Sequence, residues 1–230
     1  MSLLLQIETA TTSCSVALAK NGIVLGFRQL NQRNIHAEVI TLFIEELLLA
    51  ADLKYKDLDA IAVSSGPGSY TGLRIGISTA KGLCFALDKP LIAIETLEAM
   101  TYGVFNNEIA AVTEDMLLCP MIDARRMEVF TAIFTAGHVK IKPTAAEIID
   151  ADSFSALLET NRILFFGDGA DKCRDILGAN PNAFFLPDFT NSATYLTQKA
   201  LEKFRNNEFV DVAYFEPYYL KDFVAGKKAV

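Results

Sequence analysis

The most constraining feature of this sequence is a glycine-rich turn that joins an apolar strand to a long helix. Residues 61–63 have strand character, and the Gly-Pro-Gly at 66–68 ends that strand, because proline fixes φ and glycine accepts positive φ. Apolar and small residues then recur at helical spacing over 73–84, which predicts a helix with one buried face. Ser69 stands where it can cap that helix. Strand, turn and helix in succession favour the α/β class.

Small residues at one-turn spacing form a stripe along the same helix, at Gly72, Gly76 and Ala80. Glycine inside a helix costs about 1 kcal/mol relative to alanine, so the stripe predicts a close approach by another helix or by a ligand. A glycine turn before a helix can also hold phosphate, which makes Gly66 and Gly68 weak cofactor candidates. Their spacing matches neither the dinucleotide fingerprint nor a P-loop, and packing is the simpler interpretation.

The first thirty residues predict three strands, at 3–7, 14–19 and 23–30, with a hairpin at Asn21-Gly22. The turn at 8–13 combines an acid with several hydroxyls. One large ATP-handling fold holds Mg²⁺ and phosphate with such a turn, so Thr11 and Thr12 are the second pair of weak cofactor candidates. The alternative is that these hydroxyls only satisfy the backbone of the turn, as they commonly do.

A helix is predicted over residues 36–50, and its apolar arc is wider than one core face needs. Such a helix often serves a core on one side and a partner on another. His36 lacks a second ligand one turn later, where Ile40 stands, so no metal site is predicted. The other histidine, His138, lies near a predicted hairpin turn.

Composition limits the classes of function and the cellular compartment that are compatible with this sequence. The net charge of −7 opposes direct binding to RNA or DNA. The four cysteines are far apart and form no C-x-x-C pair, which favours free thiols over a zinc site or disulfides. No segment is long and apolar enough for a membrane span, and no secretion signal is evident, so we expect a cytoplasmic protein.

The second half partly repeats the pattern of the first. Strands are expected at 117–122, 129–135, 139–142 and 163–166, and helices at 153–159, after the Gly-Asp-Gly at 167–169, and at 192–204. A linker is expected around 106–115. These features predict an N-terminal domain at 1–105 and a C-terminal domain at 106–230.

Four segments in order resemble the TsaB (YeaZ) family, and the resemblance covers essentially the whole chain. They are Ile-Glu-Thr-Ala-Thr at 7–11, the glycine block at 66–76, Ile-Asp-Ala-Arg-Arg-Met-Glu-Val-Phe at 122–130 and Glu-Pro-Tyr-Tyr-Leu at 216–220. Glu8 departs from the family pattern, which usually has Asp there.

The resemblance implies two RNase-H-like lobes of the actin and Hsp70 type (ASKHA), each with a mixed central sheet. It also implies a non-catalytic scaffold or activator of TsaD in threonylcarbamoylation of adenosine 37 (t6A) of ANN-decoding tRNAs. TsaE would join the complex, and this chain would contact tRNA only as part of that complex. The chain alone could form a homodimer. No cofactor is expected to bind tightly, although a nucleotide could lodge at the interface shared with TsaD. The alternative is an independent ATP-binding phosphotransferase or ATPase.

The interface with TsaD is expected on the helices at 36–50 and 69–87. The expected contact residues are His36, Ile40, Phe43, Ile44, Leu47, Tyr70, Gly72, Leu73, Gly76, Ile77 and Ala80. Asp123, Arg125 and Glu128 match a family motif, and the simplest account of them is a structural salt-bridge cluster between the lobes. No catalytic residue is predicted.

Overall fold

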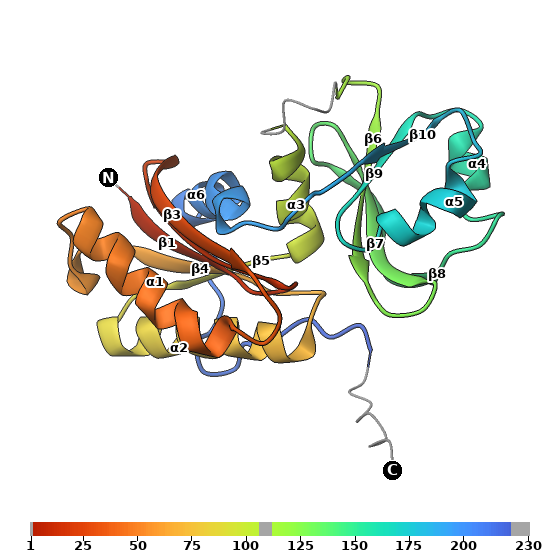
Figure 1. Ribbon diagram of the computed structural model, residues 1–230. Helices are drawn as coiled ribbons and strands as arrows, with labels where there is room; N and C mark the ends of the chain where they lie inside the picture. Colours follow the sequence, from red (N-terminus) through yellow and green to blue (C-terminus); the bar gives the residue numbers. More distant parts are fainter. Residues whose placement is uncertain (1, 106–111, 222–230) are drawn as a thin grey trace, which may run out of the picture.

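Two five-stranded sheets of the same topology form the centre of the molecule (Figure 1). The computed structural model describes residues 2–105 and 112–221. The first sheet has the order β3-β2-β1-β4-β5, with β1 at Leu3–Glu8, β2 at Ser13–Lys20, β3 at Ile23–Asn31, β4 at Ala60–Ser64 and β5 at Leu91–Ile94. The second has the order β8-β7-β6-β9-β10, with β6 at Leu117–Asp123, β7 at Glu128–Thr135, β8 at Lys140–Ile148, β9 at Ile163–Phe166 and β10 at Ala183–Leu186.

Pairing directions also repeat between the two sheets. In each sheet the first three strands pair antiparallel in sequence order. The fourth strand pairs parallel with the first, and the fifth pairs parallel with the fourth. Each sheet is therefore mixed, as predicted. The expected pair of RNase-H-like units is confirmed at the level of the fold.

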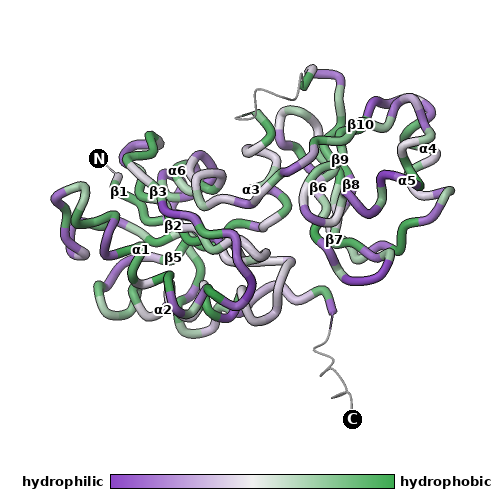
Figure 2. Tube along the Cα trace, in the orientation of Figure 1, coloured by the Kyte–Doolittle hydropathy of each residue, from purple (hydrophilic) through white to green (hydrophobic). Residues whose placement is uncertain are grey.

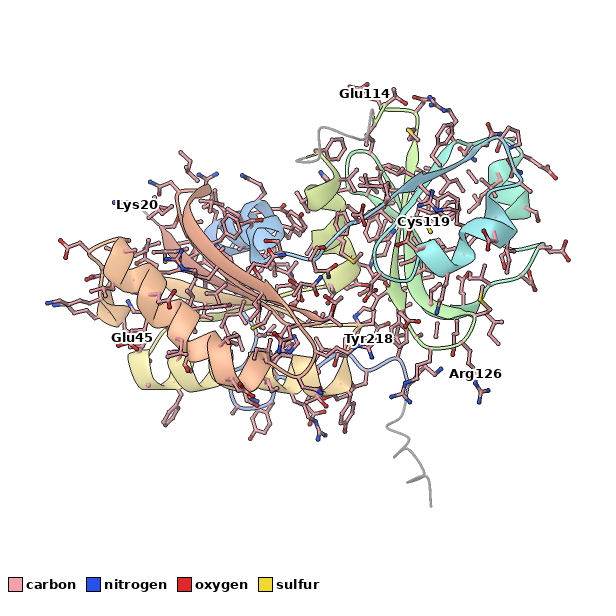
Figure 3. The ribbon with its side chains drawn as sticks, viewed as in Figure 1. Lys20, Glu45, Glu114, Cys119, Arg126 and Tyr218 are labelled. Atoms are coloured by element: carbon pink, nitrogen blue, oxygen red, sulfur yellow. The ribbon has the colours of Figure 1, made fainter. Side chains whose placement is uncertain are left out.

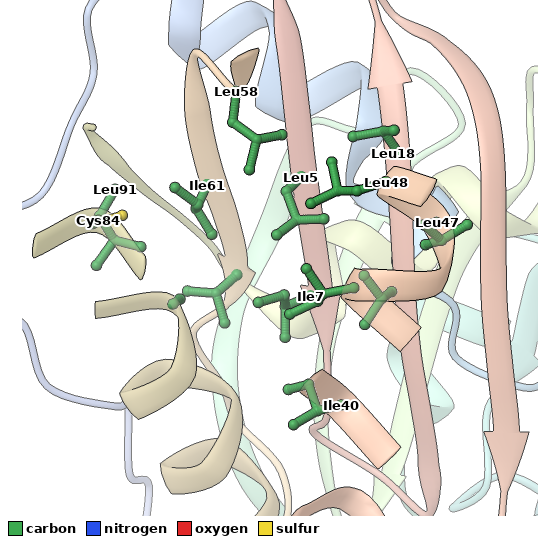
Figure 4. Packing of buried hydrophobic residues seen from close by; sticks show 14 of the residues in the cluster. Leu5, Ile7, Leu18, Ile40, Leu47, Leu48, Leu58, Ile61, Cys84 and Leu91 are labelled. Carbon is green, nitrogen blue, oxygen red and sulfur yellow. The ribbon is translucent and has the colours of Figure 1, made fainter. Parts of the chain in front are cut away.

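Helices α1 (His36–Ala50) and α2 (Tyr70–Leu87) cover one face of the first sheet, and α1 has the predicted bounds. Their apolar side chains meet those of the central strands in one core, which includes Leu5, Ile61 and Leu47 (Figure 4). A short helix, η1 at Tyr55–Asp57, leads from α1 to β4. Hydrophobic residues concentrate along the central strands of both sheets (Figure 2). Burial of this apolar surface is the main stabilising contribution to such a fold.

The space between the sheets is occupied by α3 (Thr96–Val104), η3 (Ala193–Leu196) and α6 (Thr197–Arg205). Although α3 follows the first sheet in sequence, it contributes Leu97 and Met100 to a core of the second. Conversely, α6 returns from the end of the chain and packs on β1 and β5. The two halves thus exchange helices. The domain boundary at 105/106 stays a prediction.

Differences from the predicted elements are confined to the second half. The helix expected at 153–159 is only α4 (Ser155–Leu158), and the segment after 167–169 forms η2 (Asp171–Cys173) and α5 (Arg174–Leu177). The strand expected at 139–142 extends to Ile148, because an edge strand tolerates Pro143. The short strand β10 was not predicted. Most of the expected linker, at 106–111, lies outside the described residues.

All four cysteines are free, as predicted, and all four are buried. Among the described residues, no helix combines the length and apolarity needed to cross a membrane.

Candidate functional site

The turn after β1 lies directly against the glycine face of α2. A Cβ on Gly68 would stand 2.4 Å from the backbone oxygen of Ala10, and one on Gly72 would stand 2.1 Å from that of Thr9. A Cβ on Gly76 would meet Thr9 Oγ1 at 2.1 Å. Real Cβ atoms do not approach so closely, so a side chain at any of these glycines would push the two segments apart.

This contact corrects one prediction. The glycine spacing indicated an approach by another helix or a ligand, but the atoms that approach belong to the chain's own first turn. The N–H of Ser69 donates to Ala10 O at 2.6 Å, and Ser69 Oγ accepts from Gly72 N as the predicted helix cap. A carbonyl of the protein therefore takes the N–H of the N-cap residue of α2, at the end of the helix where anions bind in phosphate sites.

Glu8 is the ionisable group at the centre of this contact and is only 1% exposed. Its Oε1 accepts hydrogen bonds from Ala10 N at 2.6 Å and from Ser64 Oγ at 3.0 Å. Burial raises the pKa of Glu8 from 4.5 to about 7, because loss of solvation outweighs the hydrogen bonds that favour the carboxylate. The carboxyl group thus links the turn to β4.

The two threonines predicted as cofactor candidates have partners inside the chain. Thr11 Oγ1 accepts from Ser13 N at 3.3 Å, and the Thr11 carbonyl lies 3.0 Å from His36 Nε2. Thr12 Oγ1 donates to Asn31 Oδ1 at 2.7 Å. These bonds fix the turn on α1 and β3. A role in cofactor binding for Thr11, Thr12, Gly66 and Gly68 stays a prediction.

Most of the residues expected at the TsaD interface face inward. Nine are buried in this chain, namely His36, Ile40, Ile44, Leu47, Gly72, Leu73, Gly76, Ile77 and Ala80, whereas Phe43 and Tyr70 are partly exposed. This burial has a simple cause: helical periodicity identifies the buried face but does not say what buries it. Contact of the eleven expected residues with TsaD stays a prediction. On the outer faces of the same helices, Leu42, Leu49 and Phe85 are exposed.

The C-terminal segment joins the glycine block, which the sequence did not predict. Tyr218 N donates to Ser65 O at 2.7 Å, and a Cβ on Gly66 would lie 2.6 Å from Tyr218 O. Tyr219 stacks on Tyr70 with a ring-centroid distance of 4.5 Å and accepts a hydrogen bond from Arg74. Tyr218 lies between the two halves of the molecule (Figure 3). Residues that meet across some 150 positions of sequence leave no local pattern from which their contact could be predicted.

Asp123 and Glu128 form two ion pairs with lysines, and Arg125 adds no side-chain ion pair among the described residues. A salt-bridge cluster of Asp123, Arg125 and Glu128 between the lobes stays a prediction. Lys172 pairs with Asp123, and Lys221 pairs with Glu128. Arg125 donates its backbone N–H to Asp123 Oδ1 at 3.0 Å in the loop between β6 and β7. Since Lys221 directly follows the C-terminal motif, its pair with Glu128 connects that motif to the second sheet. The first and the last resemblance segments therefore both contact the glycine block, and Lys221, next to the last segment, reaches the third.

Two mixed sheets of one topology, joined by exchanged helices, define an α/β protein of the actin-like, RNase-H-like class. The family model of TsaD, described as tRNA N6-adenosine threonylcarbamoyltransferase, matches residues 29–226. The tRNA threonylcarbamoyladenosine biosynthesis protein TsaB of Escherichia coli is 30% identical, over 98% of this chain and 97% of its own length. The chain belongs to the TsaB (YeaZ) family.

Two further relatives place the chain within this group. A solved structure of YeaZ from Pseudomonas aeruginosa superposes with a TM-score of 0.80 at 25% identity, covering 96% of this chain and all of that one. A tRNA N6-adenosine threonylcarbamoyltransferase of Staphylococcus aureus is 33% identical over 77% of this chain but only 51% of its own length. The chain is thus similar to the TsaB protein over full length and to the transferase over part of it.

The glycine contact predicts opposite effects of the same substitution at two positions of α2. Gly72→Ala should lower the free energy of unfolding by about 2 kcal/mol, because the new methyl group overlaps Thr9 O. Gly82→Ala should raise it by about 1 kcal/mol, because a Cβ there meets open space and alanine favours the helix. Urea unfolding measures both values. Equal effects at the two positions would contradict the contact.

Burial of Glu8 predicts a pH-dependent stability. Its folded pKa is raised, so its contribution is fully present below about pH 4.5 and is lost as pH rises through about 7. The difference between these two pKa values corresponds to about 3 kcal/mol. Glu8→Gln, which mimics the protonated group, should become more stable relative to the native chain as pH rises across this window. Parallel pH profiles of unfolding free energy would contradict the shifted pKa.

Proposed function

We propose that this chain acts in t6A biosynthesis as a non-catalytic partner of TsaD. The observation that carries the proposal is the packed contact of the first turn with α2. Where a nucleotide-handling member of this fold class would leave room for phosphate, Ala10 O accepts from Ser69 N, and Glu8 is enclosed by Ala10 and Ser64. The assignment to t6A biosynthesis rests on the similarity to TsaB and TsaD proteins.

The proposed surface for TsaD is the outer side of the layer formed by α1 and α2. Leu42 on α1 is 54% exposed, and Phe85 on α2 is 86% exposed. Large apolar side chains exposed on both helices of this layer suit a helix-to-helix interface with a related protein, because the centre of such an interface is apolar. The buried residues of both helices, such as Ile44 and Gly76, then act indirectly by setting the spacing of the layer.

The remaining partners follow from the same family membership. TsaE would join the pair, tRNA would be bound by the assembled complex, and a nucleotide would lie at the interface with TsaD. In the absence of TsaD, the same layer would pair with a second copy of this chain, because an isologous interface needs only one self-complementary surface. Location in the cytoplasm, where tRNA is modified, completes the proposal.

Reconstitution tests this function. Light scattering of the purified chain mixed with TsaD and TsaE from its own organism should show a larger complex. That mixture should form t6A on tRNA only when this chain is present. The matched control omits only this chain. A chain that remains separate, or one that hydrolyses ATP unaided, would support the alternative of an independent ATPase.

The surface assignment has its own test. Phe85→Glu should weaken binding to TsaD at least tenfold, because a charge would be buried at the centre of the interface. The thermal unfolding midpoint should change little, since the side chain is exposed. Ile148→Glu, at a 74% exposed apolar residue on β8, is the matched control and should bind normally. Equal affinities of the two variants would exclude this surface while leaving the role in t6A synthesis intact.

A further inference from the structure

A cleft between the two sheets is lined mainly by aromatic and uncharged polar side chains. Its volume is about 390 Å³, and its walls include Tyr102, Phe105, His138, Tyr195, Thr197 and Gln198. They come from α3, the turn between β7 and β8, η3 and α6, so both halves of the molecule contribute. Small-molecule sites commonly have this size and this mixture of apolar walls with a few polar groups.

The aromatic walls are held in place by packing. The rings of Tyr102 and His138 stack with centroids 3.9 Å apart and an interplanar angle of 11°, and Phe105 meets His138 edge-on. The ring of Tyr195 fits against Gly103, where a Cβ would lie 2.5 Å from Cε2. These contacts hold several ring faces before any ligand arrives, which lowers the entropic cost of binding a planar molecule.

His138 presents a hydrogen-bond acceptor. Its Nδ1 lies 2.8 Å from Thr101 Oγ1, and that hydroxyl donates its one hydrogen to Glu98 O at 2.7 Å. With that hydroxyl bonded to Glu98 O, Nδ1 is the nitrogen that donates to Thr101 Oγ1. Nε2, which has no hydrogen-bond partner among the described residues, is then an acceptor. Burial also lowers the pKa of His138, so the ring is neutral at pH 7.

Thr197 is the second unusual group in the cleft. It is 3% exposed, lines the cleft, and its Oγ1 has no hydrogen-bond partner among the described residues. A buried hydroxyl without a partner is unfavourable, and such groups are rare in folded proteins. Next to it, the Gln198 amide donates Nε2 to Gly22 O at 3.1 Å, so its Oε1 remains an acceptor. An incoming molecule with polar edges would satisfy these groups.

We propose that this cleft binds an uncharged planar heterocycle with N–H donors on its edge, of the chemical class of a purine nucleobase. The ring faces would stack on the aromatic walls, the N–H donors would meet the acceptors of His138 and Gln198, and the ligand would complete the hydrogen bonding of Thr197. The residues found to line the cleft include no Lys, Arg, Asp or Glu, so the lining itself offers a phosphate group no direct ion pair. The charges that act on both Tyr102 and His138, those of Lys199 and Glu98, have opposite signs.

Calorimetry of the purified chain with adenosine tests the site. We expect saturable binding that weakens several-fold for purine riboside, which lacks the exocyclic amine, and for AMP, which adds charge to an acidic protein. A short unpaired oligoadenylate distinguishes a free nucleoside from a base presented by RNA. If RNA presents the base, the oligoadenylate should bind at least as tightly as adenosine; if the ligand is a free nucleoside, it should bind more weakly. Absence of saturable heat with millimolar adenosine overturns the proposal.

Thr197→Val locates the binding in this cleft. Valine keeps the shape and removes the hydroxyl, so adenosine affinity should fall about fivefold, as expected for one hydrogen bond. The unfolding midpoint should stay equal or rise, because the hydroxyl has no partner in the free protein. Thr197→Ser retains the hydroxyl and should retain affinity. Unchanged affinity in Thr197→Val would place the ligand elsewhere. Adenosine binding in this cleft does not require TsaD, so failure of the binding experiment would leave the proposed function untouched.

Discussion

The contact between the first turn and the glycine face of α2 determines the geometry of the N-terminal half. Because Thr9 and Ala10 occupy the space that side chains would fill at Gly68, Gly72 and Gly76, α2 lies as close to β1 as backbone atoms allow. That distance sets the depth of the core beneath α2 and fixes the starting direction of the helix. It also explains why glycine is retained inside a helix despite its unfavourable propensity.

Because both halves repeat one sheet topology, two apolar sheet faces must be covered where the halves meet, and the exchanged helices cover them. Each sheet exposes an apolar face toward the other, and α3 and α6 cover both faces from the opposite halves of the sequence. The C-terminal segment adds a second connection through Tyr218 and through the pair of Lys221 with Glu128. The contacts of Tyr218 with the glycine block and of Lys221 with Glu128 tie the orientation of the two sheets to the glycine block.

Local sequence was sufficient for elements whose pattern is strong. The helix at 36–50 and the buried strand at 163–166 were predicted with their observed bounds, since periodicity and apolar runs are intrinsic to those segments. The same reasoning failed for β10, a four-residue strand too short to show a period. For the site, spacing identified the close approach but not Thr9 as its partner, because tertiary neighbours distant in sequence leave no local signal. The expected TsaD interface stays a prediction, and most of its residues are buried within this chain: an apolar helix face indicates burial without revealing whether the chain itself provides it.

Glu8 shows how the same fold can serve ligand binding or packing. A carboxylate after the first strand can hold a cation only if water or a ligand reaches it, and here the backbone of Ala10 and the hydroxyl of Ser64 take both positions on one oxygen. The extra methylene, relative to the Asp usual in the family, lets the carboxyl group reach these partners from β1. Desolvation then moves its pKa toward neutrality, so near pH 7 the carboxyl group is shared between an ionised and a neutral form. A group in that state suits an internal link between a turn and a strand.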